Sequence, residues 1–255
     1  MSNKEQKQLI LEGRKILRFD YTENREPTDQ MRKIPQPPLV KEASSEEIVR
    51  LPRDFNSLKL NNDVLDIIYN RESHRIFTEE SVTLLTLSFL LWATQGIKSI
   101  RGEKYATFRT VPSGGARHPF ETYLIVRKID GLKPGKYHYL PMKHELEYLG
   151  SDPDLDTKIG ISLANQRWAV SANVVFYWSI VPYRGEWRYA EFAHRIMLID
   201  IGHVCQNLYL ACEAAGLGTC AIGAFSRENC DKLFELDGEE EFTILAAPVG
   251  SVPKK

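Results

Sequence analysis

Apolar and polar positions along the chain follow two periodicities, one typical of helices and the other typical of strands. Helical spacing of apolar residues predicts helices at 4–18, 62–71, 78–96, 154–166, 187–215 and 226–236. Short, mostly apolar runs predict strands at 122–128, 137–140, 173–180, 219–225 and 242–249. Helices and strands interleave, and the turn Lys133-Pro134-Gly135 is typical of a hairpin. The pattern therefore predicts an α+β fold, with a mixed, mainly antiparallel sheet flanked by helices.

Polar residues and glycines mark several helix ends. Asn62 or Asp63 is suited to cap the second helix and Thr78 the third, because their side-chain oxygens can accept from the first backbone N–H groups. Gly216 follows the longest helix as a C-terminal cap. That helix, 187–215, carries apolar residues around much of its girth, so we expect it to be central and to contribute to a homodimer interface.

Residues 19–58 show no clear periodicity, and four of the thirteen prolines lie between Pro27 and Pro38. A structureless stretch of this length is too long for an ordinary loop. We expect an extended arm that lies over another surface, either of this chain or of a partner subunit. The chain is therefore divided into an N-terminal helix and arm, 1–58, and one domain, 59–255.

Composition narrows the class of protein without naming a function. Apolar residues make up 43% and charged residues 26% of the chain, and the formal net charge is -1. No basic excess points to nucleic acid or to an anionic membrane surface. The longest apolar run, Leu84 to Trp92, is interrupted by polar residues and is too short to span a bilayer, and the N-terminus leads into no signal-peptide core. We expect a cytoplasmic protein.

Four cysteines are present, and none belongs to a CxxC pair or has a histidine at zinc-ligand spacing. We therefore predict no metal site. Cys205, Cys212 and Cys230 are interpreted as free thiols packed as small apolar groups. A catalytic thiol stays open for Cys220 alone, because it lies in one of the candidate ligand-binding segments described next.

The segment Arg-Glu-Ser-His-Arg at 71–75 lies where one predicted helix ends and the next begins. Arg71 and Arg75, with the Ser73 hydroxyl between them, could converge on one phosphate, because the planar guanidinium forms paired, charge-assisted bonds to phosphate oxygens. The alternative is a solvated corner rich in charge.

Two glycine-containing segments and the tail are further candidates. The loop TVPSGGARHP at 110–119 is rigid and lets its backbone approach a flat or charged ligand, although a tight connection before a strand would have the same composition. Small residues in TCAIGAF at 219–225 leave room for a flat ligand, but they also suit a packed core strand. The basic pair that ends the tail could reach a phosphate or be a solvated terminus.

Together these motifs, in this order, resemble the nitroreductase superfamily. PSGGARHPFETYLIV at 112–126 and GHVCQNLYLACEAAGLGTCAIGAF at 202–225 are most similar to its SagB-type dehydrogenases. The resemblance covers about residues 60–251. It implies an FMN-dependent homodimer. In such a protein the flavin carries out the redox chemistry, and the protein positions the flavin and tunes it electrostatically.

The resemblance also implies a role for each matched residue. The segment that holds the FMN phosphate and ribityl end corresponds to Arg71, Ser73 and Arg75. The loop that contacts the flavin ring across the dimer interface corresponds to Pro112, Ser113, Gly114 and Gly115. The segment whose backbone amides approach the ring corresponds to Cys220, Ala221, Ile222 and Gly223. The terminal basic position near the phosphate corresponds to Lys254, with Lys255 beside it.

Three further residues lie inside the matched motifs. His203 is expected to be a buried histidine satisfied by hydrogen bonds. His118 is open to a functional or a structural role. Arg117 is expected to reach either the flavin or the surface.

One departure from the family concerns the proton chemistry. Heterocycle-oxidising SagB-type members carry a Lys-Tyr pair before the central helix, whereas this chain has Pro182 and Tyr183. Proline cannot act as a base, so azoline oxidation is in doubt, and Tyr183 is kept as the candidate catalytic donor or stacking residue.

The leading hypothesis is thus an FMN-dependent oxidoreductase that passes electrons between a donor such as NAD(P)H and a small-molecule or peptide substrate by ping-pong exchange. The alternatives are an azoline dehydrogenase in peptide maturation and a flavin-binding protein without turnover.

Overall fold

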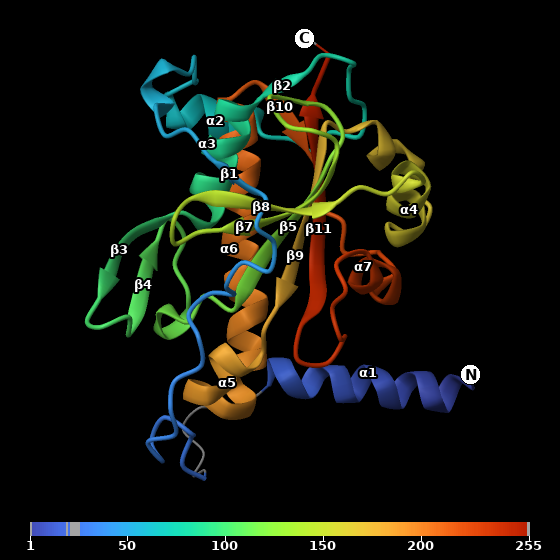
Figure 1. Ribbon diagram of the computed structural model, residues 1–255. Helices are drawn as coiled ribbons and strands as arrows, with labels where there is room; N and C mark the ends of the chain where they lie inside the picture. Colours follow the sequence, from blue (N-terminus) through green and yellow to red (C-terminus); the bar gives the residue numbers. More distant parts are fainter. Residues whose placement is uncertain (1, 19, 21–25, 254–255) are drawn as a thin grey trace.

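The computed structural model describes residues 2–18, 20 and 26–253, and an antiparallel sheet forms its centre (Figure 1). Its seven strands lie in the order β1-β8-β7-β5-β9-β11-β10, and each neighbouring pair is antiparallel. The strands are β1 (Ile48–Arg50), β5 (Phe120–Val126), β7 (Gly135–Leu140), β8 (Glu145–Gly150), β9 (Val174–Ile180), β10 (Leu217–Thr219) and β11 (Phe242–Ser251). The predicted fold class is confirmed.

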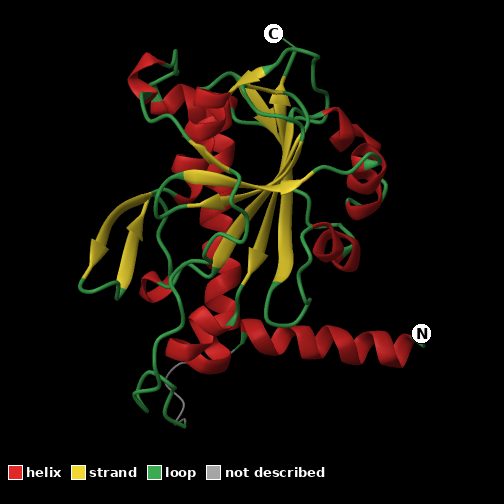
Figure 2. Cartoon of the chain, viewed as in Figure 1, coloured by secondary structure: helices red, strands yellow, loops and turns green. Residues whose placement is uncertain are grey.

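Helices cover both faces of this sheet (Figure 2). The α-helices of the described residues are α1 (Asn3–Leu17), α2 (Val64–Asn70), α3 (Leu84–Gln95), α4 (Leu155–Ser162), α5 (Tyr183–Tyr189), α6 (Ala193–Ala214) and α7 (Arg227–Leu233). Two short two-stranded sheets complete the fold. They are the parallel pair β2 (Val82–Thr83) and β6 (Ile129–Asp130), and the antiparallel hairpin β3 (Ile97–Arg101) and β4 (Ala106–Arg109).

The period-two alternation of β9 divides the interior into two apolar cores. Phe176 and Trp178 belong to the core that α3 and α6 cover. Val175 and Tyr177 belong to the core that α4 and α7 cover. Because all four side chains are fully buried, this strand reads as a continuous apolar run, as a strand with two covered faces must.

The helix predicted at 187–215 is two helices, α5 and α6. The chain turns between them at Ala190, whose φ is 47°. A Cβ atom on Gly185 would lie 3.2 Å from the Cβ atom of Ala193, so the missing side chain lets α5 pack closely on the start of α6. Tertiary packing therefore breaks a segment whose apolar spacing is continuous. Gly216, with φ of 69°, ends α6 as predicted.

Two helix starts differ in how well they were predicted. Asp63 caps α2 by accepting from the N–H groups of the next turn, as expected. The predicted cap Thr78 is wrong, because α3 begins after Thr83, whose hydroxyl accepts from Thr86 N. Residues before Thr83 are extended instead: Thr78 N–H donates to Ser251 O, and Val82 pairs with β6.

The strand predicted at 219–225 is also wrong in extent. Pairing of β10 with β11 ends at Thr219, and beyond it Ile222 forms one isolated bridge with Ala246. The hairpin β3–β4 and the strand β8 were not predicted. Pairing with a neighbouring strand defines them.

The arm lies over this chain itself. Gln30 N–H donates to Trp187 O at 2.8 Å, and the Trp187 indole donates to Ile34 O at 2.9 Å. Further along, Lys41 N–H donates to Glu121 at 2.8 Å, and β1 joins the edge of the main sheet beside β8. The arm is thus a strap that adds the edge strand β1 to the main sheet.

Candidate functional site

The first and third candidate segments meet at one end of α6. His74 N–H donates to Thr219 O at 2.9 Å. A Cβ atom on Gly218 would lie 2.6 Å from the Cβ atom of His74, so glycine is what allows 71–75 to lie against β10. The structure thus brings together two segments that are far apart in the sequence.

Tyr209 of α6 joins the two segments. Its hydroxyl lies 3.0 Å from the Ser73 hydroxyl and accepts from Ala221 N–H at 2.8 Å. The Arg71 guanidinium stacks over its ring, 5.3 Å from the centroid. Sequence reasoning missed this residue, and the one signal for it was a hydroxyl group between the apolar residues Leu208 and Leu210.

The donor groups of 71–75 are suited to an anion. Within the part of the chain that the structure describes, neither Arg71 nor Arg75 forms an ion pair with a carboxylate. Arg75 instead lies over the Trp168 ring at 5.9 Å. The two cations and the exposed Ser73 hydroxyl therefore fit a phosphate. Lys254 and Lys255 lie outside the described residues.

Segment 220–223 offers fewer free backbone N–H groups than expected. The Ala221 amide is taken by Tyr209, the Ile222 amide donates to Ala246 O at 2.7 Å, and Cys220 is buried. Gly223 differs: it is exposed, and nothing lies within 4 Å of the position that its Cβ atom would occupy. Gly223 is therefore the point at which a flat ligand can approach this backbone.

The loop 112–115 lies elsewhere, against the middle of α6. The Asp200 carboxylate accepts from the Ser113 hydroxyl at 2.7 Å and from Gly114 N–H at 3.0 Å. A Cβ atom on Gly114 would lie 2.3 Å from a methyl group of Ile196, so glycine lets the loop pack flat on the helix. Asp200, also missed from sequence, is buried, and burial raises its pKa against the opposing effect of these two donors.

The structure does not bring this loop to the 71–75 segment of the same chain. Their anchors on α6, Asp200 and Tyr209, are nine residues apart, which at the helical rise of about 1.5 Å per residue separates them by roughly 14 Å. A ligand that touches both segments therefore requires a second chain or a long span along the helix.

Of the three further residues in the matched motifs, Arg117 and His203 differ from the expectation, whereas His118 agrees with its structural alternative. Arg117 is buried and donates to Gly115 O at 3.1 Å and to Tyr105 O at 2.9 Å, so it clamps the loop. His118 is buried as well; burial and the nearby Arg109 lower its pKa to about 2, which keeps it neutral. The prediction of a buried His203 is wrong, because it lies on the exposed face of α6.

Two tyrosines near α5 differ in their hydrogen bonding. Tyr183, the predicted catalytic residue, donates to the Asp29 carboxylate at 2.9 Å, and this bond raises its pKa. Tyr105 accepts from the Gln30 amide and from the Arg188 guanidinium, both at 3.0 Å. Burial works to raise the pKa of Tyr105, but the hydrogen bond and charge of Arg188 outweigh it and lower the pKa. Tyr105 therefore gives up a proton more readily than Tyr183.

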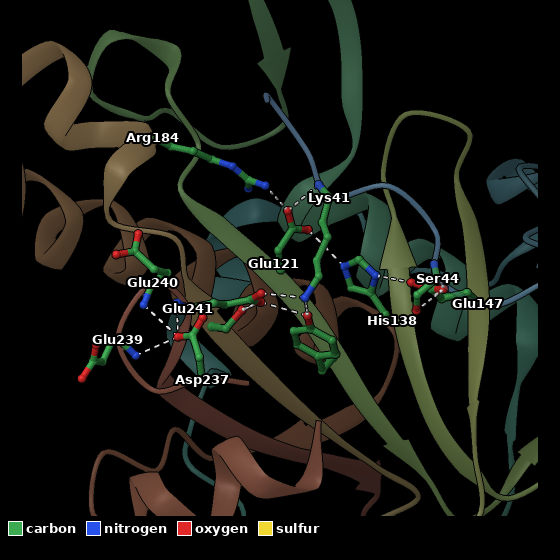
Figure 3. A network of polar contacts seen from close by, with 12 residues as sticks. Lys41, Ser44, Glu121, His138, Glu147, Arg184, Asp237, Glu239, Glu240 and Glu241 are labelled. Carbon is green, nitrogen blue, oxygen red and sulfur yellow. Dashed lines mark hydrogen bonds and ion pairs between the residues drawn. The ribbon is translucent and has the colours of Figure 1, made fainter. Parts of the chain in front are cut away.

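A second polar cluster lies apart from these segments, under the arm (Figure 3). His138 is sandwiched between the carboxylates of Glu147, at 2.7 Å, and Glu121, at 3.1 Å. Arg184 forms an ion pair with Glu121 at 2.5 Å, and Lys41 pairs with Glu241 at 2.7 Å. Sequence reasoning did not find this network, because its members come from the arm, three strands, α5 and the turn before β11.

The protonation of this network follows from its geometry. Burial works to raise the pKa of both glutamates, but His138 lowers that of Glu147 to about 2, and Arg184 with His138 lowers that of Glu121. Burial works to lower the pKa of His138, but the two carboxylates outweigh it and raise the pKa. We therefore describe His138 as a buried imidazolium between two carboxylates.

The cysteines are poor candidates for catalysis. All four are free and buried. Burial raises the pKa of Cys205 and of Cys230 to about 12, and that of Cys212 well above its usual value. A reactive thiolate needs the opposite shift. Across the described ranges, no group of three or more metal-ligating side chains is placed to hold an ion, and no helix has the length and apolarity needed to cross a bilayer.

Comparisons with known proteins agree on one family. The Nitroreductase family model matches residues 68–251. A protein of Methanocaldococcus jannaschii that carries the provisional name of a nitroreductase is 31% identical over 202 residues, which cover 79% of this chain and 95% of that protein.

Two more distant matches differ in kind. The trifolitoxin-processing protein TfxB of Rhizobium leguminosarum is 29% identical over 164 residues, covering 61% of this chain and 43% of TfxB, so this chain spans less than half of its length. A crystal structure of a provisionally named nitroreductase from Ralstonia eutropha superposes with a TM-score of 0.67 at 24% identity, covering 84% of this chain and 93% of that one. The latter match supports the fold alone.

Proposed function

We propose that this chain, which belongs to the nitroreductase family, is an FMN-dependent oxidoreductase that passes electrons between NAD(P)H and an organic substrate by ping-pong exchange. We assign FMN binding to residues 59–255, with 1–58 as helix and arm, and expect the protein to act in the cytoplasm. Its buried, free cysteines agree with that compartment. Bound FMN would supply the two-electron chemistry.

The observation that carries this proposal is the donor set at one end of α6. Arg71 and Arg75 hold the phosphate, and Ser73 contacts the sugar-alcohol chain. Gly223 leaves its backbone open to the flat ring. Tyr209 orients Arg71 and Ser73 from the helix below. These groups bind and position; none of them has to transfer electrons.

We further propose a homodimer in which the loop 112–115 of one chain meets the FMN held by the other. Within one chain this loop lies roughly 14 Å along α6 from 71–75, and a second copy would bring another such loop to the site. Large apolar side chains are exposed on α1, α2 and α6: Leu9, Leu17, Val64, Leu65, Ile68, Leu198 and Ile199. Only Ile67 of α2 is buried, so a second chain could cover the other apolar side chains of this helix.

The test of the proposed function is the flavin content of purified protein. We expect about one non-covalent FMN per chain and bleaching on anaerobic addition of NADH or NADPH. The double substitution Arg71→Ala/Arg75→Ala should release FMN, since each charge-assisted contact contributes about 1.5–3 kcal/mol. A matched control is Arg50→Ala/Lys143→Ala, which removes two exposed cations elsewhere.

Two results would contradict the proposal. Unchanged FMN affinity in the double variant would refute the phosphate assignment. FMN that neither nicotinamide donor nor any organic donor reduces would favour a flavin-binding protein without turnover.

The second candidate function is azoline oxidation on a peptide, and similarity to TfxB favours it. The lysine expected of such enzymes is replaced by Pro182, the N-cap residue of α5, with φ of -57°. Tyr183 beside it is engaged by Asp29. The test is to incubate a thiazoline-containing peptide with FMN-loaded protein. Oxidation to thiazole, detected by mass spectrometry as the loss of two hydrogens, would make azoline oxidation the preferred function.

A further inference from the structure

An open cavity of about 830 Å³ lies between the β3–β4 hairpin and the loop 110–118 that follows it. The hairpin stands away from the main sheet (Figure 1). Ser113 and Gly115 of the loop and Arg188 of α5 line the same cavity. Since this loop meets the partner's flavin in the proposed dimer, the cavity would open beside the ring.

The lining of the cavity is strongly cationic. Lys98, Arg101, Arg109 and Arg188 all contribute to it, and no acidic side chain of the described residues does. Within that part of the chain, none of these four groups forms an ion pair with a carboxylate. The whole chain has a formal net charge of -1, so this is a local concentration of positive charge, which attracts anions.

Two of these cations are held in place. Arg109 is only 4% exposed, and its guanidinium donates to Gln95 at 2.8 Å and to Thr107 at 3.2 Å. Burial lowers the pKa of Arg109 to about 10, so the group is still charged at neutral pH. Arg188 donates to the Tyr105 hydroxyl. The hydrogen-bond partners of both guanidiniums are neutral, and the nearby Glu121 carboxylate favours the charged form of Arg109, so both groups stay charged at the cavity wall.

The cavity also offers apolar surface. Phe108 and Tyr105, which are 43% and 40% exposed, line it together with Val111. Aromatic rings of this kind pack against the flat body of an organic molecule. Lys98 and Arg101 lie on β3 with exposed side chains, so they can reach a charged end of that molecule at the cavity mouth.

We propose that this cavity is the substrate site of the oxidoreductase and that its substrate is an organic anion, with a carboxylate or phosphate attached to an aromatic or other apolar body. Lys98 and Arg101 bind the anionic group, and Phe108 and Tyr105 pack on the body. The inference rests on the proposed function, because the partner's flavin ring would form the remaining wall.

The test compares two acceptors that share a nitro group and differ in charge, 4-nitrobenzoate and 4-nitrobenzyl alcohol, on the FMN-loaded protein with NADPH as donor. We expect a lower KM for the anion, and a difference that shrinks as salt screens the cations. Lys98→Ala/Arg101→Ala should raise the KM for 4-nitrobenzoate about tenfold, because the anion loses two exposed ion pairs. The KM for the neutral acceptor should stay unchanged.

The matched control is Lys104→Ala, which removes a cation from the same hairpin that does not line the cavity. A second readout, titration calorimetry with benzoate, needs no turnover. We expect the double variant to weaken benzoate binding by the same factor, and Lys104→Ala to leave it unchanged.

The outcomes separate this inference from the proposed function. If the protein carries reducible FMN but shows equal KM values for the two acceptors, or if the double variant affects only the KM for NADPH, the anion site is wrong and the oxidoreductase stands. If the protein binds no flavin, the proposed function fails, and the benzoate titrations alone decide whether the cavity takes an organic anion.

Discussion

Replacing His138 with glutamine should destabilise the protein strongly. The imidazolium is almost fully buried and donates to two carboxylates that are also buried. Glutamine at this position keeps polar atoms but carries no charge. Two buried carboxylates, whose pKa values His138 helps to lower, would then face each other across a neutral side chain.

The magnitude follows from the bonds that are lost. Each hydrogen bond to a charged group contributes about 1.5–3 kcal/mol, and removing one partner of a buried ion pair costs roughly 3–5 kcal/mol. The loss is moderated here, because Glu121 keeps Arg184 and Glu147 keeps the N–H groups of Ser44 and Ser45. We therefore expect a decrease of about 3 kcal/mol in the free energy of unfolding, the lower end of that range.

Urea denaturation of both proteins at equal concentration measures this difference. The pH dependence gives a second readout. The folded-state pKa of His138 is raised, so its contribution is complete below the unfolded pKa of about 6.5 and is lost as pH rises through the folded value. His138→Gln should lack this alkaline decline.

The matched control is His194→Gln. His194 also contacts a glutamate, Glu186, at 2.7 Å, but both side chains are partly exposed, and an exposed pair contributes at most about 1 kcal/mol. A loss below about 1 kcal/mol for His138→Gln, no larger than for the control, would refute the buried imidazolium described here.

Further predictions concern the flavin site and the dimer. Light scattering should find a dimer with an interface of roughly 2,000 Å² or more; a concentration-independent monomer with full FMN occupancy contradicts it. Asp200→Ala should leave the Ser113 hydroxyl and the Gly114 amide without their acceptor, lowering the free energy of unfolding by about 2–3 kcal/mol and loosening FMN, measured by denaturation and flavin release. Cys220→Ala should bind FMN and turn over normally in steady-state assays; loss of reduction with FMN retained would make the thiol catalytic. Tyr183→Phe should keep most activity, because its proton is held by Asp29; a loss of several orders of magnitude in kcat would show Tyr183 to be catalytic.

The sequence by itself determined the fold class and predicted candidate segments for FMN binding. Apolar periodicity located β9, α7 and most other elements, because burial on one or two faces imposes that pattern directly. The cap at Asp63 was readable for the same reason: its bonds go to the next turn of the chain. The order of the motifs then indicated the family. These motifs lie at 71–75, 110–119 and 219–225, where glycine allows close backbone packing and arginine can bind phosphate.

Only the tertiary structure decided features that depend on contacts between distant parts of the chain. The break at Ala190 follows from α5 packing on α6, and the start of α3 at Thr83 follows from the pairing of Val82 with β6. Likewise, the Glu121–His138–Glu147 network gathers residues from three strands with no shared motif, and Arg188 joins the cavity that residues 98–118 line. A side chain's neighbours within a turn or a strand are fixed by backbone geometry, whereas its neighbours across the core are fixed by how whole elements pack, and that packing is not written in any one segment.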